Sequence, residues 1–538
     1  MTHVPAFSTA ADAVAAAHLK HKSGDTAAAL AIYRSLPEMF PGKEIAGLAA
    51  TGLRVCGHWS EAVNLLEGAI AQFSVSPALV EALADAYLEI KDYPRAVAAI
   101  ERYLAQVAHN AVMWTNLGRI HGRSGDWAAA ERAFAHSLNL QPDNVDAVLD
   151  HGEALYHINR TEEAIAAYRH AIALKPEDAR GYFKLGSALV LQPDPADGKA
   201  VLFRAIALDP SNAVALTNLA GYYHRVGNLQ RAIGTARQAI ELNADVVPAY
   251  ITLGNVLLEA GDRDNAAAIL RIAADLAPES VVLLQDLAIA ENAVGNPRGA
   301  EKVLQRIIAI APDNLEARHM LAAVNGEPVR SVPSGYSRQV FNRYAPRFDR
   351  MLTDSIRYRA PEEVAALLTE TKPDPRAFKR FIDLGCGTGV VAAALVKKYV
   401  FERAVGVDIA ERMVEISRRK DLYDEVIHSD AAELLAANAG GFDLVTAVDL
   451  FTYIGDLTPL MPVMAGALAP GGILAYSIEQ MPEGRYKLQS NGRFAHAPKY
   501  VEELAVAQGL VPLASRVAVL RMEGGAEARG LIGLLQRR

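Results

Sequence analysis

The chain has 538 residues, which is too long for one hydrophobic core and predicts two or more domains. Its 51% hydrophobic and 22% charged residues exclude wholesale disorder, collagen and a disulfide-stapled small protein. The net charge of −8 is unevenly spread, because residues 1–326 carry −9 and residues 327–538 carry +1. The acidic N-terminal part should repel nucleic-acid backbones, so no nucleic-acid partner is expected.

The apolar runs and the cysteines indicate the expected cellular compartment and whether a metal site is expected. No run reaches the roughly 18 apolar residues of a membrane span, and the first residues show no basic stretch followed by an apolar one. We therefore expect no membrane association and a cytoplasmic protein. The two cysteines, Cys56 and Cys386, fit neither a disulfide framework nor a zinc site, so no metal is expected.

A 34-residue pattern repeats along the first three fifths of the chain. In the copy at residues 111–144, the small residues Gly118 and Ala130 allow two helices to cross closely, and Pro142 ends the second helix. About nine such helix–turn–helix units are expected over residues 10–314, with a capping helix at 315–324. The pattern resembles the tetratricopeptide repeat (TPR) family, which implies an all-α solenoid over residues 10–324.

Such a solenoid has a concave groove lined by the first helix of each unit. The resemblance implies that ten residues face it: Asn116, Arg119, Asp150, Glu153, Phe183, Lys184, Asn218, His224, Asn255 and Leu258. Asn116 and Asn218 recur at one groove position, where related repeats hydrogen-bond the backbone of an extended peptide; simple solvation is the alternative. We expect a protein or peptide partner in this groove. The oligomeric state is left open.

The helical pattern stops at residues 325–336, whose Gly, Pro and Ser content predicts a linker. Beyond it, over residues 337–538, short apolar runs alternate with helical stretches, which predicts a Rossmann-like α/β domain with a mostly parallel, seven-stranded sheet. The last two runs are separated by a short Gly-rich turn, so an antiparallel hairpin should close the sheet.

The sharpest motif is DLGCGTG at residues 383–389, where an apolar strand meets a glycine-rich turn that opens a helix. Glycine is needed where the backbone bends tightly and lies flat against a ligand. Taken alone, the motif also fits a dinucleotide site or a plain tight turn. The next three strands end in Asp408, Asp430 and Asp449, which would meet at the carboxyl edge of the sheet. Asp408 is placed to accept hydrogen bonds from both hydroxyls of a ribose.

Five blocks in order, DLGCGTG, VDIAERMVEISR, SDAAEL, FDLVTAVDLFTYI and LAPGGILAYSIE, resemble class I S-adenosylmethionine-dependent methyltransferases over about 200 residues. A closer similarity is to bacterial predicted methyltransferases that carry TPR repeats in the same chain. The resemblance implies S-adenosylmethionine as the cofactor and assigns it these residues: Asp383, Gly385 and Gly387 on the methionine side, Asp408 on the ribose, Met413 and Asp430 at the adenine, and Asp449 beside the sulfonium.

The methyl acceptor is expected after the fourth and fifth strands. The candidate catalytic residues are His496, Asp449 and Tyr453, and the candidate substrate-binding residues are Tyr344, Glu479, Tyr486, Arg493 and Tyr500. His496 has the pKa range of a base near neutral pH; the alternative is a structural histidine that caps the following helix. Arg493 could hold a carboxylate or phosphate, or simply pair with Glu502 or Glu503.

The leading hypothesis is a methyltransferase whose repeat arm recruits a protein or carrier-bound substrate. One alternative is a small-molecule methyltransferase whose solenoid serves oligomerisation. Another is an interaction scaffold with an inactive methyltransferase fold. The intact glycine loop and the acids Asp383, Asp408 and Asp430 speak against the scaffold. No motif indicates the acceptor atom.

Overall fold

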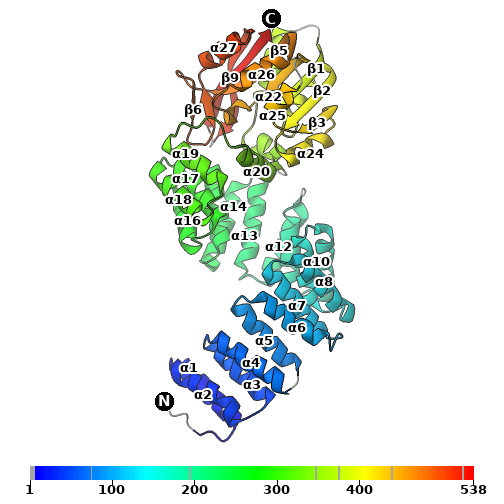
Figure 1. Ribbon diagram of the computed structural model, residues 1–538, viewed down its shortest axis with the longest axis vertical. Helices are drawn as coiled ribbons and strands as arrows, with labels where there is room; N and C mark the ends of the chain where they lie inside the picture. Colours follow the sequence, from blue (N-terminus) through cyan, green and yellow to red (C-terminus); the bar gives the residue numbers. More distant parts are fainter. Residues whose placement is uncertain are drawn as a thin grey trace. The chain divides into compact units, whose positions relative to one another are not determined.

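The chain is described here from a computed structural model (Figure 1). The structure describes residues 6–73, 75–192, 195–345, 348–372, 376–437, 440–523 and 526–538. Two compact units are present, one running through Tyr222 and the other covering Tyr223–Arg538. None of the helices in the described ranges combines the length and the hydropathy that a membrane crossing requires.

The first unit is built from helices that pack in consecutive pairs, coloured blue to cyan in Figure 1. These helices are α1 (Ala10–Lys22), α2 (Thr26–Met39), α3 (Lys43–Val55), α4 (Trp59–Phe73), α5 (Pro77–Glu89), α6 (Tyr93–Leu104), α7 (Ala111–Ser124), α8 (Trp127–Leu140), α9 (Val145–His157), α10 (Thr161–Leu174), α11 (Ala179–Leu189) and α12 (Ala196–Leu208). The next helix, α13 (Ala213–Arg225), contains the boundary between the two units.

Short polar turns and small residues build each repeat. Asp92 and Asp126 lie in the turns before α6 and α8, and each accepts a hydrogen bond from a backbone N–H in the first turn of its helix. Gly118 lies against the ring of Phe134, and a Cβ atom there would come within 2.6 Å of a ring carbon. The two helices of this repeat can therefore pack at their observed separation only around a residue without a side chain.

The second unit begins with further repeat helices and continues into an α/β domain. The repeat helices are α14 (Leu229–Leu242), α15 (Val247–Glu259), α16 (Arg263–Leu276), α17 (Val281–Ala293), α18 (Pro297–Ile310) and α19 (Leu315–Asn325). The later helices are α20 (Ser334–Tyr344), α21 (Phe348–Arg350), α22 (Ala360–Thr371), α23 (Val390–Leu395), α24 (Glu411–Arg419), α25 (Ala431–Ala436), α26 (Leu460–Ala467) and α27 (Pro498–Ala507). Two short non-α helical turns, η2 (Met351–Ser355) and η3 (Phe451–Tyr453), also lie in the described part of this unit.

One sheet forms the centre of the α/β domain. Its strands are β1 (Ala377–Leu384), β2 (Val400–Asp408), β3 (Glu425–His428), β4 (Phe442–Ala447), β5 (Leu468–Gln480), β6 (Tyr486–Leu488), β7 (Phe494–His496), β8 (Leu510–Glu523) and β9 (Ala526–Arg537). The order β3-β2-β1-β4-β5 is parallel, β9 lies antiparallel to β5, and β8 lies antiparallel to β9. The mostly parallel sheet with an antiparallel pair at its C-terminal end is confirmed. The short β6–β7 hairpin raises the count from the expected seven strands to nine within the described ranges.

The segment predicted as a linker is hydrogen-bonded to the α/β domain. The carbonyl oxygen of Arg330 accepts hydrogen bonds from the backbone N–H groups of Gly455 (2.9 Å) and Asp456 (2.8 Å). The N–H of Val332 donates to the carbonyl oxygen of Tyr453 at 2.9 Å. The chain therefore passes from α19 to α20 along the loop that follows β4, and α20 in turn contacts both α19 and α24 (Figure 1).

Candidate functional site

The glycine-rich loop joins β1 to α23 at the carboxyl edge of the sheet. Gly385 and Gly387 have φ angles of +68° and +55°, a left-handed conformation that favours glycine. A Cβ atom on Gly387 would meet the ring of Phe348 at 3.6 Å, so α21 lies directly over this part of the loop. The loop therefore forms a tight, flat backbone surface, as the motif predicts.

Asp408 ends β2 and fastens this loop. One oxygen of its carboxylate, Oδ2, accepts the N–H of Gly387 at 2.8 Å, and Oδ1 accepts the N–H of Ala410 at 2.8 Å. The side chain is buried, and burial raises its pKa although these backbone N–H groups act in the opposite direction. A carboxylate offers about four acceptor sites, so acceptor capacity remains for a further donor such as a hydroxyl group.

Asp383 is held by two hydroxyl groups at the end of β1. Tyr423 donates to its Oδ2 and Thr446 donates to its Oδ1, both at 2.6 Å. Burial raises the pKa of Asp383 to about 6, while the two hydroxyl donors act to lower it. The group therefore changes its charge close to neutral pH.

Met413 and Asp430 lie on the side predicted to hold adenine. Met413 is fully buried, in a cluster that includes Phe341 and Phe348 from α20 and α21. Asp430 is exposed and caps α25, because its Oδ1 accepts the N–H of Ala432 at 2.8 Å. Helices α20 and α21 therefore cover the predicted adenine side, and Asp430 keeps acceptor capacity beyond its capping role.

A cluster of charged side chains lies beside this edge, and we call it the acceptor-side cluster: Asp449, Tyr453, Glu479, Arg493 and Arg521. Arg493 stands at its centre and donates to Glu479 at 2.7 Å, to Asp449 at 3.1 Å and to the hydroxyl of Tyr453 at 3.3 Å. The structure thus brings together four of the residues that the sequence placed around the acceptor. Arg493 pairs with these groups rather than with Glu502 or Glu503.

Glu479 is the buried carboxylate that both arginines of this cluster bind. It is 8% exposed and accepts hydrogen bonds from Arg493, Arg521 and Gln489. Burial acts to raise the pKa of Glu479, but the charges of the two arginines outweigh burial and the pKa lies below its ordinary value. Glu479 therefore stays a carboxylate and anchors both guanidinium groups.

Two members of the cluster have features that the sequence did not predict. The backbone of Asp449 is left-handed, and Arg521 was not among the candidate residues. Asp449 has a φ angle of +58°, rare for a residue with a side chain, and its N–H donates to Ser477 Oγ at 2.8 Å. Arg521 lies on β8 and is 4% exposed. The sequence feature that could have indicated Arg521 as a site residue is its position as an arginine inside an otherwise apolar run of this strand.

The remaining candidates lie apart from this cluster. His496 is fully buried, and its Nε2 lies 2.9 Å and 3.0 Å from the carbonyl oxygens of Ile454 and Gly455, so Nε2 carries the proton. Burial lowers the pKa of His496. Its neighbours include the rings of Tyr486 and Tyr500. These contacts are those of a side chain that supports the 454–455 turn, and its role as a base stays a prediction.

Tyr500 and Tyr344 have surroundings of their own. The hydroxyl of Tyr500 accepts the N–H of Leu457 at 3.0 Å and donates to Asp456 at 3.2 Å, so it helps to fix the loop after β4. Tyr344 lies on α20 with the guanidinium of Arg343 5.5 Å from its ring centre. Substrate-binding roles for both tyrosines stay predictions.

The loop between β6 and β7, residues 489–493, is held from the solenoid. His319 on α19 donates from Nε2 to the carbonyl oxygen of Gly492 at 2.8 Å, and Asn292 on α17 donates to the carbonyl oxygen of Ser490 at 2.9 Å. The same loop carries Gln489 and Arg493, which bind Glu479. The last repeat helices therefore position part of the acceptor-side cluster.

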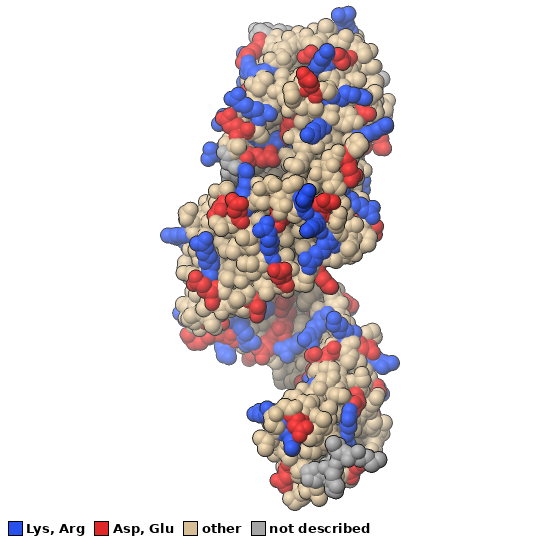
Figure 2. All heavy atoms as spheres, turned by 90° about the vertical axis from the view of Figure 1, so that its left-hand side faces the viewer, with Lys and Arg blue, Asp and Glu red and all other residues tan. Residues whose placement is uncertain are grey.

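Many polar residues predicted to line the solenoid groove bind one another. Pairs of side chains 31 residues apart link neighbouring repeats: Arg119–Asp150, Lys184–Glu153, Asn218–Ser187 and Asn255–Asp286. Asn116 likewise donates to Glu81 at 3.1 Å. A peptide in the groove would therefore meet side chains that already have intramolecular partners. On the face in Figure 2, basic and acidic side chains are interspersed across the described part of the second unit.

Comparison with known proteins identifies both parts of the chain. A family described as "Methyltransferase domain" matches residues 356–501, and tetratricopeptide repeat families match residues 57–120, 152–192, 183–246 and 257–324. Demethylmenaquinone methyltransferase of Thermus thermophilus is 31% identical over 157 residues, which are 28% of this chain and 69% of that protein. The chain therefore belongs to the methyltransferase family, in a form that also carries TPR repeats.

Other relatives are similar over shorter segments. Trans-aconitate 2-methyltransferase of Paracidovorax citrulli is 31% identical over 109 residues, which cover 20% of this chain and 41% of the relative. Ubiquinone biosynthesis O-methyltransferase of Thiobacillus denitrificans is 30% identical over 108 residues, which cover 19% of this chain and 45% of the relative. The chain thus spans less than half of the length of these two relatives.

We expect His319→Ala to loosen the β6–β7 loop, because the carbonyl oxygen of Gly492 loses its donor. Amide hydrogen exchange in residues 489–493, measured by mass spectrometry on the full chain, should become about tenfold faster, the effect of one hydrogen bond. His319→Gln, which keeps an N–H donor, should restore part of the protection. The exposed His18→Ala is the control. Unchanged exchange in His319→Ala would show that the solenoid does not hold this loop.

Proposed function

We propose that the chain is an S-adenosylmethionine-dependent methyltransferase whose solenoid recruits a protein or carrier-bound substrate. The observation that carries the first part is Asp408, a buried carboxylate that is fixed by the glycine loop and retains acceptor sites. This arrangement fits a ribose diol. The left-handed glycines, Asp383 and the covered Met413 fit the rest of the same molecule.

The residues of this chain would act by holding and orienting. When bound, S-adenosylmethionine supplies a methyl group that is already activated on sulfur. Phe341 and Phe348, above Met413, exclude water from the adenine side. The carboxylates of Asp383 and Asp449 make the site favourable for positive charge. Asp449 can also accept a proton from an acceptor hydroxyl or amine, so alignment and one base are sufficient.

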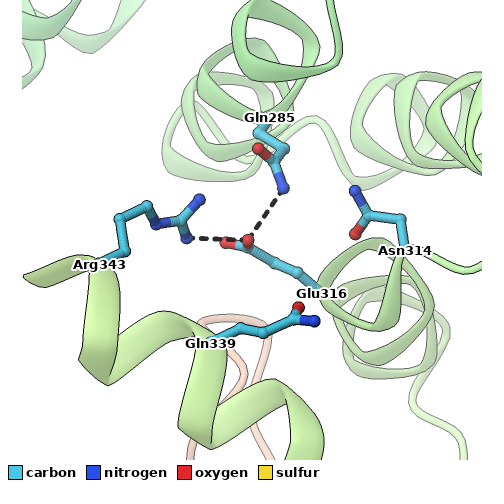
Figure 3. A pocket seen from close by; sticks show the side chains of 5 residues that line it. All are labelled: Gln285, Asn314, Glu316, Gln339 and Arg343. Carbon is cyan, nitrogen blue, oxygen red and sulfur yellow. Dashed lines mark hydrogen bonds and ion pairs between the residues drawn. The ribbon is translucent and has the colours of Figure 1, made fainter. Parts of the chain in front are cut away.

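A pocket where the solenoid meets the α/β domain supports recruitment of a polypeptide. Its volume is about 290 Å³, and Gln285 of α17, Asn314 and Glu316 at the start of α19, and Gln339 and Arg343 of α20 line it (Figure 3). Glu316 accepts hydrogen bonds from Gln285 and Arg343, both at 2.9 Å. Three carboxamide side chains provide donors and acceptors of the kind that pair with peptide groups. The same helix, α20, also carries Phe341, whose ring centre lies 5.2 Å from that of Tyr453 in the acceptor-side cluster. Helix α20 therefore contacts both the pocket and the acceptor-side cluster.

A second candidate is a methyltransferase for a small molecule. The relatives named for trans-aconitate and ubiquinone biosynthesis support it, because their printed names refer to small acceptors. In that case the solenoid would serve another purpose, such as oligomerisation.

Asp408→Ala should weaken binding of S-adenosylhomocysteine and S-adenosylmethionine by about 2–4 kcal/mol, because two charge-assisted hydrogen bonds to the ribose are lost. Isothermal calorimetry on the full chain measures this change. The control is Glu415→Ala, an exposed carboxylate on α24. Equal affinities in wild type and Asp408→Ala would refute the ribose assignment, and no binding by wild type would refute the cofactor itself.

The affinity for S-adenosylhomocysteine should fall as the pH drops below about 6. Burial raises the pKa of Asp383 to about 6, so the group is a carboxylate above this pH and neutral below it. Only the carboxylate attracts the ammonium of the ligand, which gives a loss of up to about tenfold per pH unit. Calorimetry between about pH 5 and about pH 8 should show a smaller dependence of this affinity on pH for Asp383→Asn. An equal dependence in both proteins would remove Asp383 from the ligand site.

Combined Gln285→Ala and Gln339→Ala should reduce transfer of labelled methyl groups to macromolecules in a cell lysate by about tenfold, the effect of losing one or two hydrogen bonds to a peptide. Binding of S-adenosylhomocysteine should stay unchanged. The matched control is Gln305→Ala, an exposed glutamine of α18 that lies outside the pocket. If label enters only small molecules, and equally in all variants, the second candidate is supported instead.

A further inference from the structure

Arg521 is a buried cation with an unused donor. One of its terminal nitrogens, Nη2, donates to Glu479 and to Glu523, while the other, Nη1, is buried and has no hydrogen-bond partner among the described residues. A buried donor left without an acceptor is costly, so such groups commonly mark the place of a ligand or an ordered water.

Asp449 has a buried acceptor without a hydrogen-bond partner among the described residues, which complements the unused donor of Arg521. Its Oδ2 accepts a hydrogen bond from Arg493 at 3.1 Å, while Oδ1 is buried and has no partner within the described ranges. The two unsatisfied atoms are therefore one acceptor and one donor. Both belong to the acceptor-side cluster, which lies at the carboxyl edge of the sheet beside the loop after β4.

The two side chains are close enough to influence one another. Burial and Arg493 act to lower the pKa of Arg521, but Asp449 and Glu479 outweigh them and the pKa lies above its ordinary value. The side chain of Asp449 keeps 21% of its surface exposed and that of Arg493 keeps 19%, so this edge of the cluster faces solvent, while Oδ1 of Asp449 and Nη1 of Arg521 are themselves buried. The ring of Tyr453, with Phe341 packed edge-on against it, provides an aromatic wall.

We propose that Asp449 and Arg521 together bind the acceptor group of the substrate, and that this group is uncharged and carries an N–H or O–H donor beside a carbonyl oxygen. The donor meets Oδ1 of Asp449, and the carbonyl oxygen accepts from Nη1 of Arg521. This assignment deepens the proposed methyltransferase function and rests on it. Arg521 becomes a residue that selects the acceptor.

The charge of the cluster argues for an uncharged group. Arg493 and Arg521 are balanced by Asp449 and Glu479, and Glu523 adds a further negative charge next to Arg521. A carboxylate or phosphate would gain no net attraction and would place an anion against Oδ1 of Asp449. A carboxamide, or a hydroxyl next to a carbonyl, satisfies both open positions at once.

Three related probes test this assignment on the full chain, with and without S-adenosylhomocysteine: benzamide, benzoate, which has nearly the same shape, and the bulkier N,N-dimethylbenzamide, which has no N–H donor. Benzamide alone offers both a donor and a carbonyl without charge. It should bind with a millimolar Kd, and the other two about tenfold or more weakly, the effect of one lost hydrogen bond to a charged group. A second comparison uses hydroxyacetone, which has an O–H donor beside its carbonyl, and acetone, which has the carbonyl alone. Tighter binding of hydroxyacetone would show that the site also accepts an O–H donor.

Two variants assign the contacts. Arg521→Lys keeps the positive charge beside Glu479 but lacks the second terminal nitrogen, so benzamide should bind about tenfold more weakly. Arg516→Lys, on the same strand, is the control and should bind as wild type does. Asp449→Asn can present an N–H donor in place of Oδ1, so the preference should reverse toward benzoate. This reversal cannot arise from a variant that merely fails to fold.

The outcomes separate this inference from the proposed function. If S-adenosylhomocysteine binds but no probe does, or if benzoate binds as tightly as benzamide, the inference is overturned and an internal water is the occupant of the two open positions. If benzamide binds selectively and S-adenosylhomocysteine does not, the acceptor pair stands as a binding site while the proposed methyl transfer falls.

Discussion

The buried carboxylate of Glu479 is the constraint on which the acceptor side of this protein depends. A charge removed from water has to be paired, and Glu479 is paired with two guanidinium groups and one carboxamide that come from different parts of the chain. The end of β5, the β6–β7 loop and β8 are thereby brought to one place. Arg493, once anchored there, also fixes Asp449 and Tyr453. Loss of either arginine would leave a buried negative charge only partly paired.

The repeat helices nearest to the α/β domain belong physically to this arrangement. His319 and Asn292 bind the backbone of the β6–β7 loop on one side, while the side chains of the same loop bind Glu479 on the other. Ala322, Ala323 and Val332 share an apolar cluster with Leu488 and Phe494 of the hairpin. The solenoid's last helix therefore acts as a wall of the α/β domain, in addition to being the end of a repeat array.

The sequence predicted the repeat solenoid, the mostly parallel sheet with its antiparallel C-terminal pair, and the position of the glycine loop, because each has a strict local period or a required residue. It could not predict Arg521. A β-bulge lies between Val519 and Arg521, so the alternation of the strand breaks and both Leu520 and Arg521 are buried. Arg493 directly precedes β7 and His496 ends it, so the two side chains lie three residues apart in extended chain and are directed to opposite faces. The paired groove residues depend on contacts between repeats, which a single repeat pattern does not reveal.

The contact of the last repeat helices with the β6–β7 loop has a consequence for how such chains can change over evolutionary time. Only helices from α17 onward supply the contacts described for the β6–β7 loop, and these contacts come from Asn292 and His319. Whole repeats added or removed upstream of α17 would lengthen or shorten the arm without altering the groups that surround the acceptor. Duplication of an upstream repeat can therefore lengthen the arm or change its partner without changing the acceptor side. The final repeat, in contrast, has to be inherited together with the α/β domain that it supports.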